Sequence, residues 1–222
     1  MILNSLLNIE NATQERNYKY FSALGMLFVT VLLTANIIGE KPIQMGFLEV
    51  PSGLLVFPLT YLLGDALAEV YGFKKSRQVI FMALFANLFM ALVCYLVITL
   101  PAPVAYPKTL AYEQVLGQTI RLMLVSVFTY LIGEFTNTYI VSYLKIKMQG
   151  RLFWLRGLCG SWVGEFVETM LFIPLGFYGV RTWEQIQEMM IFVYLFKITY
   201  AFLAMPLLNQ FVLWLKKQEG VP

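Results

Sequence analysis

The chain has 222 residues, of which 59% are hydrophobic and 13% are charged, and its formal net charge is +3. Soluble domains carry about 25% charged residues, so this composition excludes a soluble globular protein and indicates an integral membrane protein. There is no His, which removes the most frequent zinc ligand and the usual general base. Cys94 and Cys159 are far apart without CxxC spacing, so we expect no disulfide framework, no metal and no cofactor.

Six apolar segments follow one another along the chain, each about 20 residues long, which is the length a helix needs to cross a bilayer. They predict an all-α integral membrane protein with six transmembrane helices. We place these helices at residues 20–39, 52–71, 78–100, 119–143, 157–179 and 190–214. The domain organisation is therefore a leader (1–19), one six-helix transmembrane domain (20–215) and a short tail (216–222).

Basic residues gather at one side of these spans. Lys74, Lys75 and Arg77 follow the second span, the 145–156 stretch follows the fourth, and Lys216 and Lys217 follow the last. Cytoplasmic flanks collect Lys and Arg, so we expect both termini in the cytoplasm. The polar leader has no small-residue cleavage pattern, and the first span is therefore interpreted as a helix that is kept.

Charged residues also fall inside the predicted spans. A carboxylate facing lipid at the centre of a helix costs about 2.5 to 3.5 kcal/mol, so such groups are expected to face the interior of the bundle. The residues concerned are Asp65, Glu69, Glu134, Glu165, Glu168 and Lys197.

Three short segments share one pattern: GDALAE (64–69), GEFTNT (133–138) and GEFVET (164–169). In each, a Gly precedes an acid, and a second polar residue follows on the same helix face. The likeness of the second and fifth spans suggests a 3+3 inverted repeat, with a site at the interface of the two halves. Chance similarity between apolar segments is the alternative.

Four blocks of the sequence resemble the queuosine precursor transporter family, also called the vitamin uptake transporter family. They are TANIIGEK (34–41), FPLTYLLGDALAEVYGFKKSR (57–77), GEFTNTYI (133–140) and GSWVGEFVET (160–169). The resemblance covers about residues 30–180, and its most specific part is the GD-x-x-x-EVYG segment. In the last block, Glu165 and Glu168 stand where many relatives have Gln and Asp.

The resemblance implies a multi-pass protein of the bacterial cytoplasmic (inner) membrane that imports 7-deazaguanines. These are 7-cyano-7-deazaguanine, 7-aminomethyl-7-deazaguanine and queuine, from which cells build the tRNA nucleoside queuosine. The implied partners are a small nucleobase-like substrate and membrane lipid, with no nucleic acid, and the assembly is a homodimer or a monomer.

A carboxylate suits this substrate because a guanine-like edge offers N1–H and NH₂ side by side, which a carboxylate accepts as a bidentate pair. Glu134 is the favoured acceptor, with Glu165 and Glu168 as the other acids for this role. Aromatic side chains that stack on the ring are expected among Tyr61, Phe135, Tyr139 and Phe166. The full candidate set for substrate binding is Asn36, Lys41, Asp65, Glu69, Glu134, Asn137, Glu165, Glu168 and Lys197.

Some of these residues also have a purely structural interpretation. Asp65 and Glu69 would pair with Lys74, Lys75 or Arg156 near the cytoplasmic helix ends. Glu168 and Lys197 would form a buried ion pair that is either architectural or a gate. Gly160 and Gly164 form a GxxxG pattern, which is typical of close helix packing.

The sequence has no G-x-x-x-x-G-K-[ST] phosphate loop, which favours secondary transport, with a buried acid as a carrier of protons. Two alternatives stay open. One is the substrate-binding membrane subunit of an ATP-driven vitamin uptake system. The other is a membrane-embedded enzyme with a carboxylate site, against which the missing His and the missing H-E-x-x-H spacing argue.

Overall fold

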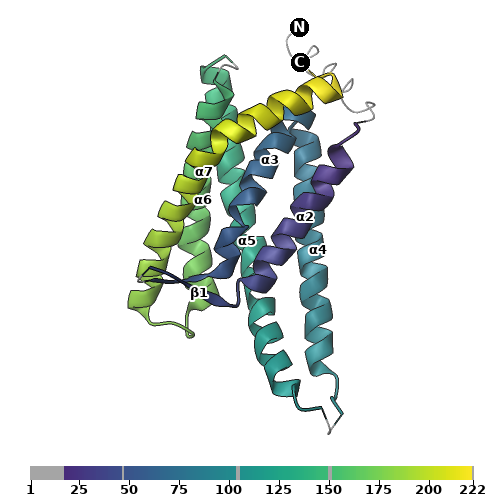
Figure 1. The fold of residues 1–222 in the computed structure, drawn as a ribbon, viewed down its shortest axis with the longest axis vertical. Helices are drawn as coiled ribbons and strands as arrows, with labels where there is room; N and C mark the ends of the chain where they lie inside the picture. The colour runs from purple at the N-terminus through teal and green to yellow at the C-terminus, as the bar shows by residue number, and fades with distance from the viewer. Residues whose placement is uncertain (1–17, 47, 104–105, 150–151, 222) are drawn as a thin grey trace.

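The computed structural model describes residues 18–46, 48–103, 106–149 and 152–221, and Figure 1 shows its helical bundle. Six helices are long and apolar enough to cross a membrane, which confirms the predicted fold class. They are α2 (Phe21–Ile38), the segment Ser52–Tyr71 that ends in α3 (Pro58–Tyr71), α4 (Phe73–Thr99), α5 (Thr109–Lys147), α6 (Phe153–Phe177) and α7 (Trp183–Glu219).

Several helices are longer than the spans predicted from hydrophobicity. The 39 residues of α5 and the 37 of α7 correspond to about 58 and 55 Å at 1.5 Å per residue, well beyond the hydrocarbon core. A capping box starts α7 before the apolar window: Thr182 Oγ1 accepts from Gln185 N–H at 3.4 Å, and Gln185 Oε1 accepts from Thr182 N–H at 3.1 Å. Polar turns can therefore extend a helix outside the lipid.

The second span has the predicted bounds, Ser52–Tyr71, but it is not one continuous α-helix. An antiparallel hairpin of β1 (Pro42–Met45) and β2 (Leu48–Pro51) follows α2, and a short 3-10 helix, η1 (Ser52–Leu55), connects it to α3. Pro58 at the first turn of α3 suits a helix start, where an N–H is dispensable. The hairpin was not predicted, because four-residue strands leave no periodic signal.

The segment η1 packs directly on the end of α2. Ser52 Oγ donates to the carbonyl of Ile38, and Ser52 N–H donates to the carbonyl of Lys41 at 3.0 Å. A Cβ added to Gly53 would lie 2.5 Å from the carbonyl oxygen of Ala35, so only glycine allows this approach. Non-helical backbone is tolerated at membrane depth where it is buried in protein or lines a cavity.

Both ends of the described chain lie at one face of the bundle (Figure 1), which we call the terminal face. There Glu219, at the end of α7, accepts from the backbone N–H groups of Lys19 and Tyr20 at 3.0 and 2.7 Å. The hairpin lies at the opposite face, the hairpin face. That the terminal face is cytoplasmic stays a prediction, as do the domain bounds and the inverted repeat; residues 1–17 of the predicted leader lie outside the described residues.

Helix α3 lies in the middle of the bundle, and most of its residues are buried. Beside it, α5 and α6 approach closely through glycine. A Cβ on Gly164 would lie 2.8 Å from the carbonyl oxygen of Gly133, and a Cβ on Gly160 would collide with the side chain of Asn137. The predicted close packing at Gly160 and Gly164 is confirmed, and it brings the polar residues of both helices toward α3.

We expect Gly164→Ala to lower the stability of the bundle by about 1 to 3 kcal/mol, because the added methyl group forces α5 and α6 apart. The matched control is Gly117→Ala on α5, where an added Cβ meets nothing within 4 Å. Thermal melting of the purified protein in detergent checks both variants. A Gly164→Ala protein that melts at or above the wild-type temperature contradicts this packing.

Candidate functional site

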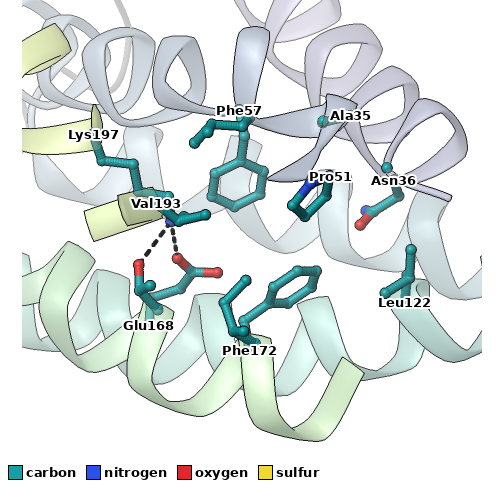
Figure 2. A pocket seen from close by; sticks show the side chains of 14 residues that line it. Ala35, Asn36, Pro51, Phe57, Leu122, Glu168, Phe172, Val193 and Lys197 are labelled. Carbon is teal, nitrogen blue, oxygen red and sulfur yellow. Dashed lines mark hydrogen bonds and ion pairs between the residues drawn. The ribbon is translucent and has the colours of Figure 1, made fainter. Parts of the chain in front are cut away.

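A pocket lies between the end of α2, η1, α5, α6 and α7 (Figure 2). Its walls are mostly apolar, and it has charged and polar groups at two separate places. The pocket is nearer to the hairpin face than to the terminal face, since Pro51, Gly53 and Leu54 of the hairpin and η1 line it.

One end of the pocket carries an ion pair. Lys197 of α7 donates to Glu168 Oε2 and, at 3.2 Å, to Thr169 Oγ1, both on α6. Lys197 Nζ also lies 4.8 Å from the centre of the Phe57 ring, within the range of a cation–π contact. Lys197 is 4% exposed and Glu168 is 1% exposed, so the pair that the sequence predicted is formed and fully desolvated.

The other end of the pocket carries an amide. Asn36 of α2 donates from Nδ2 to Asn87 Oδ1 at 3.1 Å and to Ser126 Oγ at 3.4 Å, and Asn87 in turn donates to the carbonyl of Met123 at 3.0 Å. These bonds use the donors of Asn36 and orient its amide, which leaves Oδ1 to accept from a ligand.

Two aromatic rings lie between these ends. Figure 2 shows Phe57 and Phe172 on opposite sides of the space, with Lys197 and Glu168 at one end and Asn36 at the other. A narrow space with aromatic walls and polar ends suits a flat molecule with polar edges.

A second polar group is buried closer to the terminal face. Asp65 of α3 accepts from Asn137 Nδ2 on α5 at 3.4 Å and from Ser161 Oγ on α6 at 3.3 Å. Glu165 lies on α6 between Ser161 and Glu168; it is 1% exposed, and neither of its oxygens has a hydrogen-bond partner among the described residues. Three acids thus follow one another beside α6. Asp65 of α3 is bonded to Ser161, Glu165 lies one turn further along α6, and Glu168 lines the pocket.

Glu134 does not line this pocket. Its Oε1 accepts from Thr138 Oγ1 at 3.5 Å, and it lines a separate small hollow together with Arg77 of α4 and Phe135. The helix that carries Glu134 is correctly predicted, and Glu134 interacts with Asn137 and Asp65 inside the bundle, but this group lies outside the pocket. Only a tertiary structure shows this separation.

Two further candidates lie away from the pocket. Lys41 is exposed in the turn before β1. Glu69 accepts from Lys216 Nζ at 2.9 Å at the terminal face; its predicted structural role in an ion pair thus has a different partner from those expected. Among the expected stacking residues, Tyr61 is buried, whereas Phe135, Tyr139 and Phe166 are exposed on the outside of the bundle, where lipid would cover them.

The pocket also contains residues that the sequence interpretation missed, namely Phe57, Phe172, Thr169 and, behind Asn36, Asn87 and Ser126. Asn87 had a usable signal, because a buried amide in the middle of an apolar span is unusual unless it has a partner. The phenylalanines had none, since this chain has 18 of them. No group of three or more Asp, Glu, Cys or His in the described part of the chain is placed to hold a metal ion.

A six-helix membrane bundle around a desolvated pocket with polar ends is the architecture of a membrane protein that binds a small solute within the bilayer. The family model described as "Putative vitamin uptake transporter" matches residues 51–210, and the chain belongs to this family.

A curated relative named "Probable queuosine precursor transporter", from Bacillus subtilis (strain 168), is 23% identical over 194 residues, which are 85% of this chain and 84% of that protein. These matches confirm the family that the sequence blocks predicted. No solved structure is significantly similar to the chain.

We expect Lys197→Met to lower the free energy of unfolding by about 3 to 5 kcal/mol, because it leaves the Glu168 carboxylate unpaired in the protein interior. Glu168→Gln should lower it less, because Glu165 lies within the electrostatic reach of Lys197 and can replace Glu168 as its partner. The double variant should recover most of this loss. Thermal melting in detergent measures all three. If the double variant loses as much as the two single losses together, the two residues do not act as a pair.

The control for this comparison is Glu49→Gln. Glu49 pairs with Arg181 at 2.7 Å, but the two side chains are 51% and 24% exposed, so the loss should be at most about 1 kcal/mol.

Proposed function

We propose that the chain imports queuosine precursors, that is, 7-deazaguanines such as 7-cyano-7-deazaguanine, 7-aminomethyl-7-deazaguanine or queuine, by secondary transport coupled to protons. Its family and the name of its relative support a role as a transporter. The chemistry of the pocket supports the class of substrate, and it carries the proposal.

The supporting observation is the ion pair of Lys197 and Glu168 at the end of a flat aromatic space. Side by side, an ammonium group and a carboxylate present donors next to acceptors. A guanine-like edge presents the complement, because its O6 accepts while its N1–H and NH₂ donate. Adenine has an amino donor in place of O6 and a ring acceptor in place of N1–H. Its donor would therefore face the Lys197 ammonium group, and its acceptor would face the Glu168 carboxylate.

The remaining polar group of the pocket adds a second fixed point. Asn36 Oδ1 is available to accept from the pyrrole N–H at the opposite side of a deazaguanine ring. Phe57 and Phe172 would stack on the two faces of the ring, where stacking is worth about 1 to 3 kcal/mol per base. Glu168 thus takes the role that the sequence interpretation favoured for Glu134.

The location of the pocket agrees with import. If the terminal face is cytoplasmic, as the basic residues predict, the pocket is nearer to the outside of the cell. Substrate would then enter from the hairpin face and leave at the terminal face after a rearrangement of the bundle.

We expect Phe57→Leu to weaken binding of all three deazaguanines about tenfold, because one stacking partner is lost. Wild type should prefer them to adenine by at least about tenfold, since adenine leaves desolvated polar groups unpaired. Binding to the purified protein is measured by competition with labelled 7-cyano-7-deazaguanine.

Glu134→Gln is the deciding comparison in this experiment. It should bind as wild type does, because Glu134 lies outside the pocket. If Glu134→Gln abolishes binding while Phe57→Leu does not change it, the substrate lies at Glu134 and the pocket assigned here is wrong.

Uptake into vesicles that contain this protein alone distinguishes a carrier from a subunit. We expect uptake without ATP or any second protein. Uptake that needs a separate ATPase would favour the substrate-binding subunit of an ATP-driven system.

A further inference from the structure

The position of Glu165 calls for a functional explanation, because burial there is energetically unfavourable for an ionised carboxylate. It lies in the middle of α6, it is 1% exposed, and neither carboxylate oxygen has a hydrogen-bond partner in the described part of the chain. A buried ion without partners is strongly unfavourable, and such a group becomes neutral instead. Asp65 differs, since two side chains donate to it.

The groups around Glu165 supply no spare positive charge. Those that interact with it are Asp65 and Tyr61 of α3, Glu168 of α6, and Lys197 and Tyr194 of α7. Lys197 is the cation among them, and its charge is already matched by Glu168. Glu165 and Glu168 therefore compete for one lysine, and the acid that does not have it is the one that must hold a proton.

We propose that Glu165 is the proton-binding site of this transporter, and that its proton decides whether Lys197 stays with Glu168 in the pocket. The inference rests on the proposed function. With a proton on Glu165, Lys197 remains beside Glu168, and together they form the donor and acceptor edge that holds the ligand. When the proton leaves, ionised Glu165 attracts Lys197, the edge is dismantled and the ligand is released.

This exchange couples proton and ligand in the direction that import requires. The protein binds the proton and the ligand together, and the loss of either one weakens binding of the other, as thermodynamic linkage requires. The proton leaves the Glu165 carboxyl group and passes to water at the terminal face, with the Asp65 carboxylate as the next acceptor. Asp65 is bonded to Ser161, which precedes Glu165 by one helical turn, about 6 Å along the helix axis. No other bond is made or broken.

The test uses the full chain in vesicles, with 7-cyano-7-deazaguanine as the probe. One measurement is accumulation driven by a pH gradient, acid outside; the other is exchange of labelled for unlabelled probe without a gradient. For one proton per neutral solute, a gradient of one pH unit supports about tenfold accumulation. We expect this in wild type. Glu165→Gln, which mimics the protonated carboxyl group, should keep exchange and lose accumulation.

The matched control is Glu49→Gln, which removes an exposed carboxylate that is bonded to Arg181 at 2.7 Å, outside this row of groups. It should keep both exchange and accumulation. Accumulation by Glu165→Gln at the wild-type level overturns the inference, as does a wild type that exchanges but ignores the gradient. A Glu165→Gln protein that does not fold overturns it too, because Gln closely resembles the neutral acid.

A measurement without ligand separates this inference from the proposed function. Infrared spectra of wild type at neutral pH should contain the carbonyl band of a protonated carboxyl group that Glu165→Gln lacks. Glu168→Gln should also lose this band, because it releases Lys197 to ionise Glu165. If wild type binds no deazaguanine but these band changes occur, the proposed substrate is wrong and the proton site stands. If the Glu165→Gln spectrum keeps the band, the proton site is wrong.

Discussion

Hydrocarbon offers no hydrogen-bond partner and no counter-ion, so each charge that this chain buries in the membrane must be neutralised within the bundle. The ion pair of Lys197 and Glu168 meets this constraint at the pocket, and the bonds from Asn137 and Ser161 meet it for Asp65. Replacing such a pair by apolar residues is often neutral or stabilising in proteins, so stability alone does not explain its presence. The proposed role in recognising a polar solute does.

Close packing makes this arrangement of charges compatible with a small protein. Glycines at the contact of α5 and α6 let two helix backbones approach, and Gly53 lets η1 pack on the end of α2. Without a hydrophobic driving force between helices in lipid, such van der Waals contacts and buried polar bonds hold the bundle together. The same contacts define the pocket, because η1 brings Pro51 and Phe57 above the α6 residues Glu168 and Phe172.

The polar groups differ in how firmly they are held. This difference distinguishes groups suited to binding the substrate from groups suited to coupling its transport to protons. Asn36 is fixed by two hydrogen bonds, so it presents one acceptor in one orientation. Lys197 has three donors and a flexible stem, and two acids lie within its electrostatic reach. A fixed group suits recognition of the substrate, whereas a group with two alternative partners suits a switch.

The sequence by itself determined the class of protein, the number of spans and the family, because hydrocarbon thickness, hydrophobicity and the GD-x-x-x-EVYG block are local properties of the chain. It also identified the pair of Glu168 and Lys197, since buried charges need partners. Only the tertiary structure separated Glu134 from the pocket and brought Phe57 and Asn36 into it. Helical periodicity shows which residues share a face of one helix, but the partner of that face depends on how six helices pack, and on a hairpin too short to leave a pattern.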